Sequence, residues 1–181
     1  MNDGEFSDRL LPGERVVWSG RPAEGVLLTG RDAFLIPFSI LWCAFVVFWM
    51  FGAATAGGGF ALFGLPFVAF GLFFSIGRFW VDAWLRGGTR YAVTNRRILI
   101  LKRRPSSSFT SLELDRLPQV QVSEGAGGKG TLRFGAPTSL FAFNGAGFSV
   151  WMPSLDPTPQ FIAIPAARQV FDLIQQQSRT A

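Results

Sequence analysis

The sequence predicts an α+β membrane protein, in which a transmembrane helical hairpin carries a small antiparallel β-domain that ends in an amphipathic helix. Of its 181 residues, 49% are apolar and only 16% are charged, which is unusually apolar for a soluble domain of this length. Residues 33–77 contain no Asp, Glu, Lys or Arg. Short β-rich segments separated by turn residues follow this uncharged stretch.

The uncharged stretch predicts two membrane-spanning helices, 33–54 and 60–81, within a hairpin domain that covers 33–86. Each helix would be about 33 Å long at about 1.5 Å per residue, enough to cross a hydrocarbon core of about 30 Å. The segment "TAGGG" between them suits a reversal of the chain, and Pro37 and Pro66 predict kinks. A soluble two-helix core is the alternative, but it would need more surrounding protein than this chain supplies.

The distribution of arginines predicts the orientation of the hairpin. None lies in the predicted turn, whereas the flanking segments contain Arg9, Arg15, Arg21, Arg31, Arg78, Arg86, Arg90, Arg96 and Arg97. Because cytoplasmic loops carry the excess of basic residues, both termini are expected in the cytoplasm, including the N-terminal segment 1–32. Trp80 and Trp84, next to Arg78 and Arg86, are expected to form an interfacial belt where the second helix leaves the membrane.

Residues 88–181 are predicted to form the cytoplasmic β-domain. Seven strands are expected from "YAV", "ILIL", "FTSLEL" (109–114), "QVQV" (119–122), "TLRF" (131–134), "SLFAF" (139–143) and "FSVWM" (148–152). The segment "ERVVW" could add a strand from before the hairpin. A helix is expected at about 165–177, with Ala167, Val170, Phe171 and Ile174 on one stripe. The glycine-rich "GAGGKG" indicates a hairpin loop, because a strand follows it where a nucleotide-binding motif needs a helix.

Three sequence blocks carry a resemblance to a known family. They are "LLPGERVVWSGRP" (10–22), "RYAVTNRRILIL" (90–101) with a Tyr-x-x-Thr-Asn-Arg-Arg signature, and "SLELDRLPQVQVSEG" (111–125), which a Gly-Thr hairpin follows. With "FIAIPAARQVFDLI" at the end, the chain resembles the bacterial pleckstrin-homology-like, membrane-flanked domain family of small membrane proteins. The resemblance implies a pleckstrin-homology-like barrel or sandwich capped by a C-terminal helix, in a multi-pass protein of the bacterial inner membrane. Leu117-Pro118 and the proline-rich 152–159 depart from the family pattern.

A cluster of basic residues is the candidate contact site for a lipid or a protein partner. It consists of Arg96, Arg97, Lys102, Arg103 and Arg104. If these side chains face the same way, each could contribute about 1 kcal/mol of attraction to anionic headgroups. The alternative is a solvated turn that acts only as a topology signal. Within the turn, Thr94 and Asn95 are expected to bond to the backbone, and Arg96 or Arg97 to pair with an acid such as Asp115.

The composition argues against an enzyme, a cofactor or a metal site. The chain has no His, and its one cysteine, Cys43, lies in the uncharged stretch. Asp115, Glu113, Glu124 and Asp156 form no recognisable catalytic pair. A nucleic-acid partner is not expected either, because "KRRP" offers few phosphate contacts and the hairpin keeps the domain at the bilayer.

The expected function is therefore that of a membrane-tethered binding or scaffolding module. It would present a cytoplasmic interaction surface to an unidentified membrane or cytoplasmic protein. One alternative is a module that senses anionic lipid headgroups. Another is an accessory subunit of a transporter or a secretion system.

Overall fold

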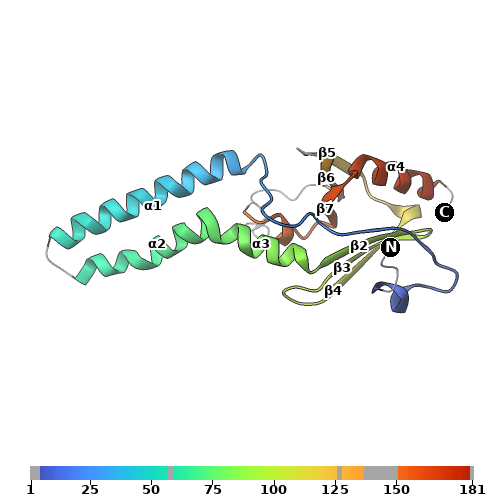
Figure 1. Ribbon diagram of the computed structural model, residues 1–181, viewed down its shortest axis with the longest axis horizontal. Coiled ribbons are helices and arrows are strands. Elements are labelled where there is room, and N and C mark those ends of the chain that lie inside the picture. Colours follow the sequence, from blue (N-terminus) through green and yellow to red (C-terminus); the bar gives the residue numbers. More distant parts are fainter. Residues whose placement is uncertain (1–4, 57–58, 126–127, 137–150, 180–181) are drawn as a thin grey trace.

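The computed structural model describes residues 5–56, 59–125, 128–136 and 151–179. It contains two long apolar helices in a hairpin, two antiparallel sheets of four and three strands, and a C-terminal helix. The hairpin extends like a rod from one end of the β-domain, and both chain ends lie at that domain (Figure 1). The predicted fold class is confirmed.

The two arms of the hairpin differ in regularity. The first arm is one helix, α1 (Asp32–Thr55). The second arm consists of the 3-10 turn η3 (Gly59–Gly64), α2 (Leu65–Leu72), the π-helical turn η4 (Phe73–Gly77) and α3 (Arg78–Gly87). Both arms are long and apolar enough to cross a membrane, and only 17% of the most apolar window of each is buried. Most of these apolar side chains therefore lie outside any protein core.

Glycines allow the two arms to approach closely. A Cβ on Gly64 would overlap the side chain of Met50, and one on Gly71 would overlap Cys43 Sγ. Small residues at such positions are typical of helix pairs that pack in membranes. Pro66 lies in the first turn of α2, where a missing N–H costs little, so it begins that helix instead of kinking it.

The larger sheet joins parts of the chain from both sides of the hairpin. Its strands, in spatial order, are β1 (Val16–Gly20), β2 (Thr89–Thr94), β3 (Arg97–Lys102) and β4 (Ser108–Glu113). β1 precedes the hairpin and pairs antiparallel with β2, with Gly20 opposite Tyr91. The N-terminal segment is thus part of the β-domain.

The four aliphatic residues of β3 are buried because both faces of the sheet are covered around them. Ile98 and Ile100 face the main core, whereas Leu99 and Leu101 pack with Phe6 from the N-terminal segment. A strand that is buried on both faces reads as a continuous apolar run, which explains why "ILIL" shows no alternation.

The smaller sheet consists of β5 (Val120–Glu124), β6 (Lys129–Phe134) and β7 (Gln160–Pro165). β5 and β6 form the hairpin predicted from the glycine-rich segment, of which residues 126–127 lie outside the described residues. The predicted strand 139–143 and most of 148–152 also lie outside them. Trp151 and Met152 are described and belong to no strand.

The two sheets enclose one core. It is formed by Tyr91, Val93, Ile98, Ile100, Leu114, Leu132, Phe134, Phe161 and Ile164, together with Ala167, Val170 and Ile174. Phe161 contacts the rings of Trp18, Tyr91 and Phe134, with centroids 4.5–5.6 Å apart. Ile162 N–H donates to the Tyr91 hydroxyl at 3.0 Å, and burial raises the pKa of that phenol. This bond links the larger sheet to β7.

The C-terminal helix α4 (Ala167–Ser178) packs on the sheets, as its apolar stripe predicted. Val170 and Ile174 are buried and Phe171 is half-buried. The helix begins at Ala167 and not at Pro165, because Pro165 ends β7 and Ala166 adopts a left-handed conformation with φ +50°. That residue turns the chain from the strand into the helix.

Candidate functional site

The candidate site is the end of the β-domain next to the hairpin. β2 begins at Thr89, directly after α3, and the antiparallel return of β3 sets Lys102 opposite Thr89. Arg103 N–H donates to the Gly88 carbonyl at 3.0 Å. The pairing thus brings the chain from Lys102 to Arg104 back to the last turn of α3. We refer to Arg90, Lys102, Arg103 and Arg104 as the hairpin-proximal basic surface.

The five basic residues singled out in the sequence do not form one patch. Arg96 and Arg97 lie at the β2–β3 turn, at the opposite end of β3 from Lys102. At about 3.3 Å per residue, the strand separates Arg97 from Lys102 by about 17 Å. Only Lys102, Arg103 and Arg104 are brought together beside the hairpin.

Arg97 has a structural partner that the sequence did not reveal. Its Nε lies 2.9 Å from Glu14 Oε1 and its Nη2 lies 2.9 Å from Glu14 Oε2, so the ion pair is bidentate. The prediction that this arginine pairs with Asp115 is wrong, because β1 brings Glu14 to the β2–β3 turn. Asp115 instead lies 3.7 Å from Arg116 on the surface.

The Glu14 carboxylate is buried and fully bonded. Besides the bonds from Arg97, it accepts one from Leu11 N–H at 2.7 Å and one from the Thr94 hydroxyl at 2.7 Å. Burial by itself raises the pKa of Glu14, but the hydrogen bonds from Arg97, Leu11 and Thr94 and the charge of Arg97 outweigh it, so the pKa lies below its ordinary value. Glu14 is therefore ionised in the folded protein at neutral pH.

Thr94 and Asn95 bond to the backbone as predicted, and Asn95 does so with a residue from before the hairpin. Thr94 Oγ1 accepts hydrogen bonds from the backbone N–H groups of Arg96 (3.2 Å) and Arg97 (2.9 Å). The side-chain oxygen of Asn95 accepts from Arg15 N–H at 2.9 Å, and Asn95 N–H donates to the Arg15 carbonyl at 3.1 Å. Asn95 thus ties the turn to the start of β1.

The hairpin-proximal basic surface combines cations with an exposed aromatic ring. The Arg104 guanidinium lies over the Trp84 ring at 5.3 Å and donates to the Trp84 carbonyl at 3.1 Å. Glu5 lies 3.1 Å from Arg90 and 3.3 Å from Arg103. Burial lowers the pKa of Lys102, although the charge of Asp156 opposes the shift.

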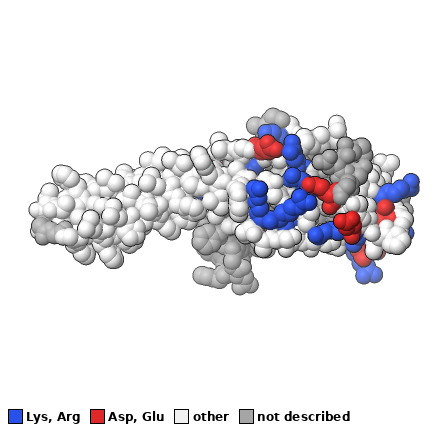
Figure 2. All heavy atoms as spheres, turned by 60° about the horizontal axis from the view of Figure 1, so that its bottom comes forward, with Lys and Arg blue, Asp and Glu red and all other residues white. Residues whose placement is uncertain are grey.

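The charges gather where the domain meets the hairpin. Figure 2 shows Lys and Arg side chains on the β-domain next to the hairpin, whereas the visible hairpin surface carries almost none. Trp80 and Trp84 point outward from α3, with 76% and 52% of their surface exposed. This arrangement offers cationic and aromatic contacts to whatever surrounds the base of the hairpin.

Arg78 and Arg86 were predicted to lie in an exposed interfacial belt, and that prediction is wrong. They are only 1% and 2% exposed. Arg78 Nη2 lies 2.6 Å from Asp32 Oδ1 at the start of α1, and Arg86 Nε lies 2.7 Å from Asp82 Oδ2. Within the described part of the chain, neither Arg78 Nε nor Arg78 Nη2 has a hydrogen-bond partner of good geometry, and Nη1 donates to the Trp151 carbonyl at 3.2 Å, so the nearby charge of Asp32 is the main compensation for the buried guanidinium.

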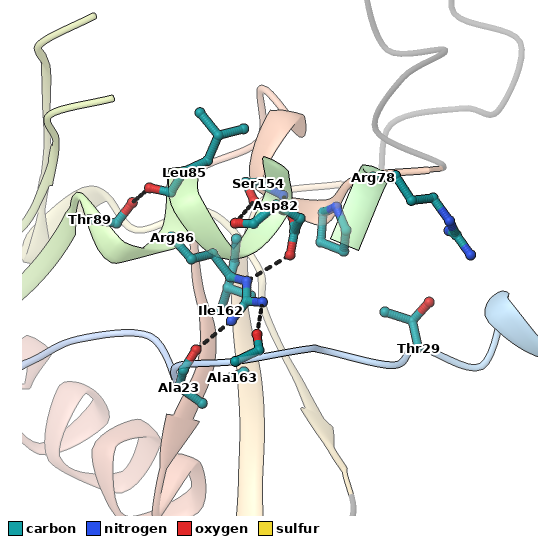
Figure 3. Close-up of polar contacts among 12 residues, drawn as sticks. Ala23, Thr29, Arg78, Asp82, Leu85, Arg86, Thr89, Ser154, Ile162 and Ala163 are labelled. Atoms are coloured by element: carbon teal, nitrogen blue, oxygen red, sulfur yellow. Dashed lines mark hydrogen bonds and ion pairs between the residues drawn. The ribbon is translucent and has the colours of Figure 1, made fainter. Parts of the chain in front are cut away.

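Arg86 and Asp82 of α3 also contact the N-terminal segment and the turn that contains Ser154, so that three segments meet at one junction (Figure 3). Arg86 reaches from α3 to the N-terminal segment, where it donates to the carbonyls of Ala23 and Gly25. Asp82 accepts hydrogen bonds from the backbone N–H and the hydroxyl of Ser154, in the 3-10 turn η8 (Pro153–Leu155). The β-domain is therefore fastened to the base of the hairpin by buried polar contacts.

Sequence reasoning missed the acidic members of these contacts. The spacing of Asp82 and Arg86 is the one signal that could have revealed a pair, because residues four apart in a helix are neighbours. Nothing local indicates that Asp32 meets Arg78 or that Glu14 meets Arg97. In each case the two residues lie on opposite sides of the uncharged stretch.

Comparisons of the chain with protein-family models, with curated proteins and with solved structures gave no match. Among the residues that the structure describes, no group of three His, Cys, Asp or Glu side chains is placed to hold a metal ion. The candidate site is therefore defined by its own geometry, which is that of a basic and aromatic contact surface.

Proposed function

We propose that the chain is a small integral membrane protein of the bacterial inner membrane and that its β-domain is a tethered, pleckstrin-homology-like binding module. The observation that carries the proposal is the buried junction at the base of the hairpin, where Arg86 of α3 donates to the carbonyls of Ala23 and Gly25 and Asp82 accepts from Ser154 N–H. These hydrogen bonds tolerate little displacement, because breaking them would leave buried polar and charged groups without partners. The domain is accordingly held in one orientation and presents the same faces to the cytoplasm.

Two features support the membrane location and the family resemblance. The outward-facing apolar side chains of both hairpin arms would be costly to expose to water over so large an area. Sheets of four and three strands around one core, with a C-terminal helix packed on them, match the arrangement that the resemblance implies. We infer the family from this agreement together with the three sequence blocks.

The function that we favour is binding or scaffolding of a membrane or cytoplasmic protein. β4 is an edge strand of the larger sheet, and its side chains are exposed or half-buried. An edge strand offers unpaired backbone donors and acceptors to an extended segment of a partner.

This function is tested by purifying the tagged full chain in mild detergent and identifying co-purified proteins by mass spectrometry. The variant Ser111→Arg places a charged side chain on exposed β4, and Ser106→Arg is the matched control in the exposed segment before β4. We expect a specific partner to be lost with Ser111→Arg and kept with Ser106→Arg. The proposal would be refuted if both variants and an unrelated membrane protein all co-purified with the same set of proteins.

Contact with anionic lipid headgroups is a second candidate, favoured by Arg104 stacked on the exposed ring of Trp84. Each basic residue near the surface could supply about 1 kcal/mol of attraction, and Glu5 offsets part of the charge of Arg103. Arg96 and Arg97, at the far end of β3, would take no part.

Lipid retention by the full chain tests this candidate. Native mass spectrometry compares anionic with zwitterionic lipid bound to the wild type and to the triple variant Lys102→Gln, Arg103→Gln, Arg104→Gln. The control removes three exposed arginines elsewhere, with Arg96→Gln, Arg168→Gln and Arg179→Gln. We expect only the first triple variant to lose its enrichment in anionic lipid; equal enrichment in all three proteins would exclude a headgroup role for this surface.

A further inference from the structure

A polar pocket of about 400 Å³ lies between the outer face of the smaller sheet and the segment that leads into α1. Residues of β5 and β6 form one wall of this pocket. Because side chains alternate between the two faces of a strand, every second residue points away from the core, and in these two strands those residues are hydrophilic. Gln121 lies opposite Arg133, and Ser123 lies opposite Thr131. Arg133 in turn lies opposite Gln160 of β7.

The N-terminal segment forms the opposite wall of the pocket. Ala23 N–H donates to the Ala163 carbonyl at 3.0 Å, which ties the segment to β7. Thr29, whose hydroxyl donates to Asp32 at 2.8 Å, and Arg31 then line the pocket just before α1 begins. The pocket therefore sits at the level where the first arm of the hairpin leaves the β-domain.

The charges in the pocket leave a positive surplus. Arg133 Nη2 lies 3.2 Å from Asp156 Oδ2, so these two charges offset one another, and Arg133 also donates to Gln160 at 3.3 Å. Arg31 is exposed at the rim, and no acidic side chain among the described residues forms an ion pair with it. A ligand with negative charge would meet an uncompensated guanidinium there.

We propose that this pocket binds a phosphate ester of a small polyol, either free in the cytoplasm or as the headgroup of an anionic glycerophospholipid. Guanidinium groups match the geometry of phosphate oxygens. The side chains of Gln121 and Ser123 both donate and accept, and the Thr131 hydroxyl, which accepts from Ala163 N–H, can still donate, which suits the hydroxyl groups of a polyol. The volume lies within the range of small-molecule sites.

The lining argues against a nucleotide. None of the described residues that line the pocket is aromatic, so a base would find no ring on which to stack. The pocket is also distinct from the hairpin-proximal basic surface, because neither Arg90 nor the residues from Lys102 to Arg104 line it. The inference therefore goes beyond the proposed function and does not depend on it.

Two arms of one experiment on the full chain distinguish the sources of the ligand. In the first arm, glycerol 3-phosphate is titrated into the detergent-solubilised protein by calorimetry. In the second arm, native mass spectrometry compares retained phosphatidylglycerol with retained phosphatidylcholine. Both arms use the wild type and two pocket variants, Arg31→Gln, which removes the surplus charge, and Ser123→Trp, which fills the pocket without changing its charge. Arg21→Gln, in the same N-terminal segment but outside the pocket, is the control.

We expect Arg31→Gln to weaken binding about tenfold, which corresponds to about 1.4 kcal/mol. Ser123→Trp should abolish binding, and Arg21→Gln should leave it unchanged. If the titration with glycerol 3-phosphate shows this pattern, the ligand is a free phosphate ester. If only the retention of phosphatidylglycerol shows it, the ligand is a lipid headgroup. Absence of binding in both arms, or equal binding by the wild type and both pocket variants, would overturn the proposal.

Discussion

At the scale of single residues, three buried acids determine how distant segments of this chain meet. Glu14, Asp32 and Asp82 are each at most 6% exposed, and each lies within 3 Å of an arginine nitrogen. A buried charge is costly unless it is paired and hydrogen-bonded. Glu14 and Asp32 each meet an arginine from beyond the uncharged stretch, and Asp82, which pairs with Arg86 within α3, joins that helix to Ser154.

Replacing Glu14 by Gln should destabilise the protein at neutral pH. The variant keeps the shape of the side chain but loses the charged bonds to Arg97, which is a loss of about 1.5–3 kcal/mol. Thermal unfolding of the full chain in detergent, followed by circular dichroism, measures this loss. Glu113→Gln on the exposed face of β4 is the control and should unfold like the wild type.

The same pair predicts a pH dependence. The pKa of Glu14 is lower in the folded than in the unfolded chain, so the unfolded chain takes up the proton first as the pH falls. The contribution of Glu14 is complete above the unfolded pKa and is lost as the pH falls through the folded pKa. The difference in unfolding temperature between the wild type and Glu14→Gln should thus shrink as the pH falls below the ordinary pKa of a glutamate, which is about 4.3. A difference that stayed constant as the pH fell would contradict the assignment.

The Arg78–Asp32 pair predicts strong coupling between two substitutions. Asp32→Asn alone leaves the buried Arg78 without its counter-charge and should cost about 3–5 kcal/mol. Arg78→Met combined with Asp32→Asn removes both charges and should cost clearly less than the sum of the two single changes. Unfolding temperatures of the four proteins in detergent provide the cycle. Strictly additive effects would show that the pair does not stabilise the contact between α1 and α3 at the base of the hairpin.

At the scale of elements, α4 and β3 show that the arrangement of apolar residues in an element reflects which of its faces are covered. The stripe on α4 predicted its buried face, and Ile174, which is 1% exposed, lies at the centre of the contact with the sheets. Apolar and polar residues do not alternate in β3, because the N-terminal segment covers the face of this strand that points away from the main core. A fragment that begins at residue 88 would lack both β1 and this cover.

Truncating Ile174 tests whether α4 belongs to the core. Ile174→Ala should destabilise the full chain by about 2–5 kcal/mol, because it removes buried methyl groups and leaves a cavity. Gln175→Ala, one residue further along and exposed, should change stability little. If α4 instead served only as an exposed surface for a partner, both variants would melt like the wild type.

At the scale of the whole molecule, the hairpin and the pairing of β1 with β2 constrain the topology together. β1 precedes the hairpin and β2 follows it, so both flanking segments must lie on the same side of any membrane that the hairpin crosses. Our proposal that this side is the cytoplasm rests on the arginines that flank the hairpin.

Reporter fusions test this orientation. Alkaline phosphatase, which is active only outside the cytoplasm, should be active when it is fused after Ala56 and inactive when it is fused after Ala181. A fluorescent protein that folds only in the cytoplasm should give the reverse pattern. Active phosphatase at Ala181 would overturn the topology.

Local composition and periodicity were enough to predict the two apolar arms, most of the strands and the C-terminal helix. Residues 33–77 lack charge, Thr94 and Asn95 are turn residues, and the stripe on α4 is read directly from its spacing. Even the separation of Arg97 from Lys102 follows from their spacing once the segment between them is taken as a strand.

The ion pairs between distant segments became visible only in the folded chain. Arg97 bonds to Glu14, Arg78 and Arg86 are buried, and the polar face of the smaller sheet becomes a pocket. Each of these outcomes requires the N-terminal segment to return across the base of the hairpin and lie on the sheets. Local patterns carry no information about such contacts, because the free energy of an ion pair depends on distance and burial and not on separation along the chain.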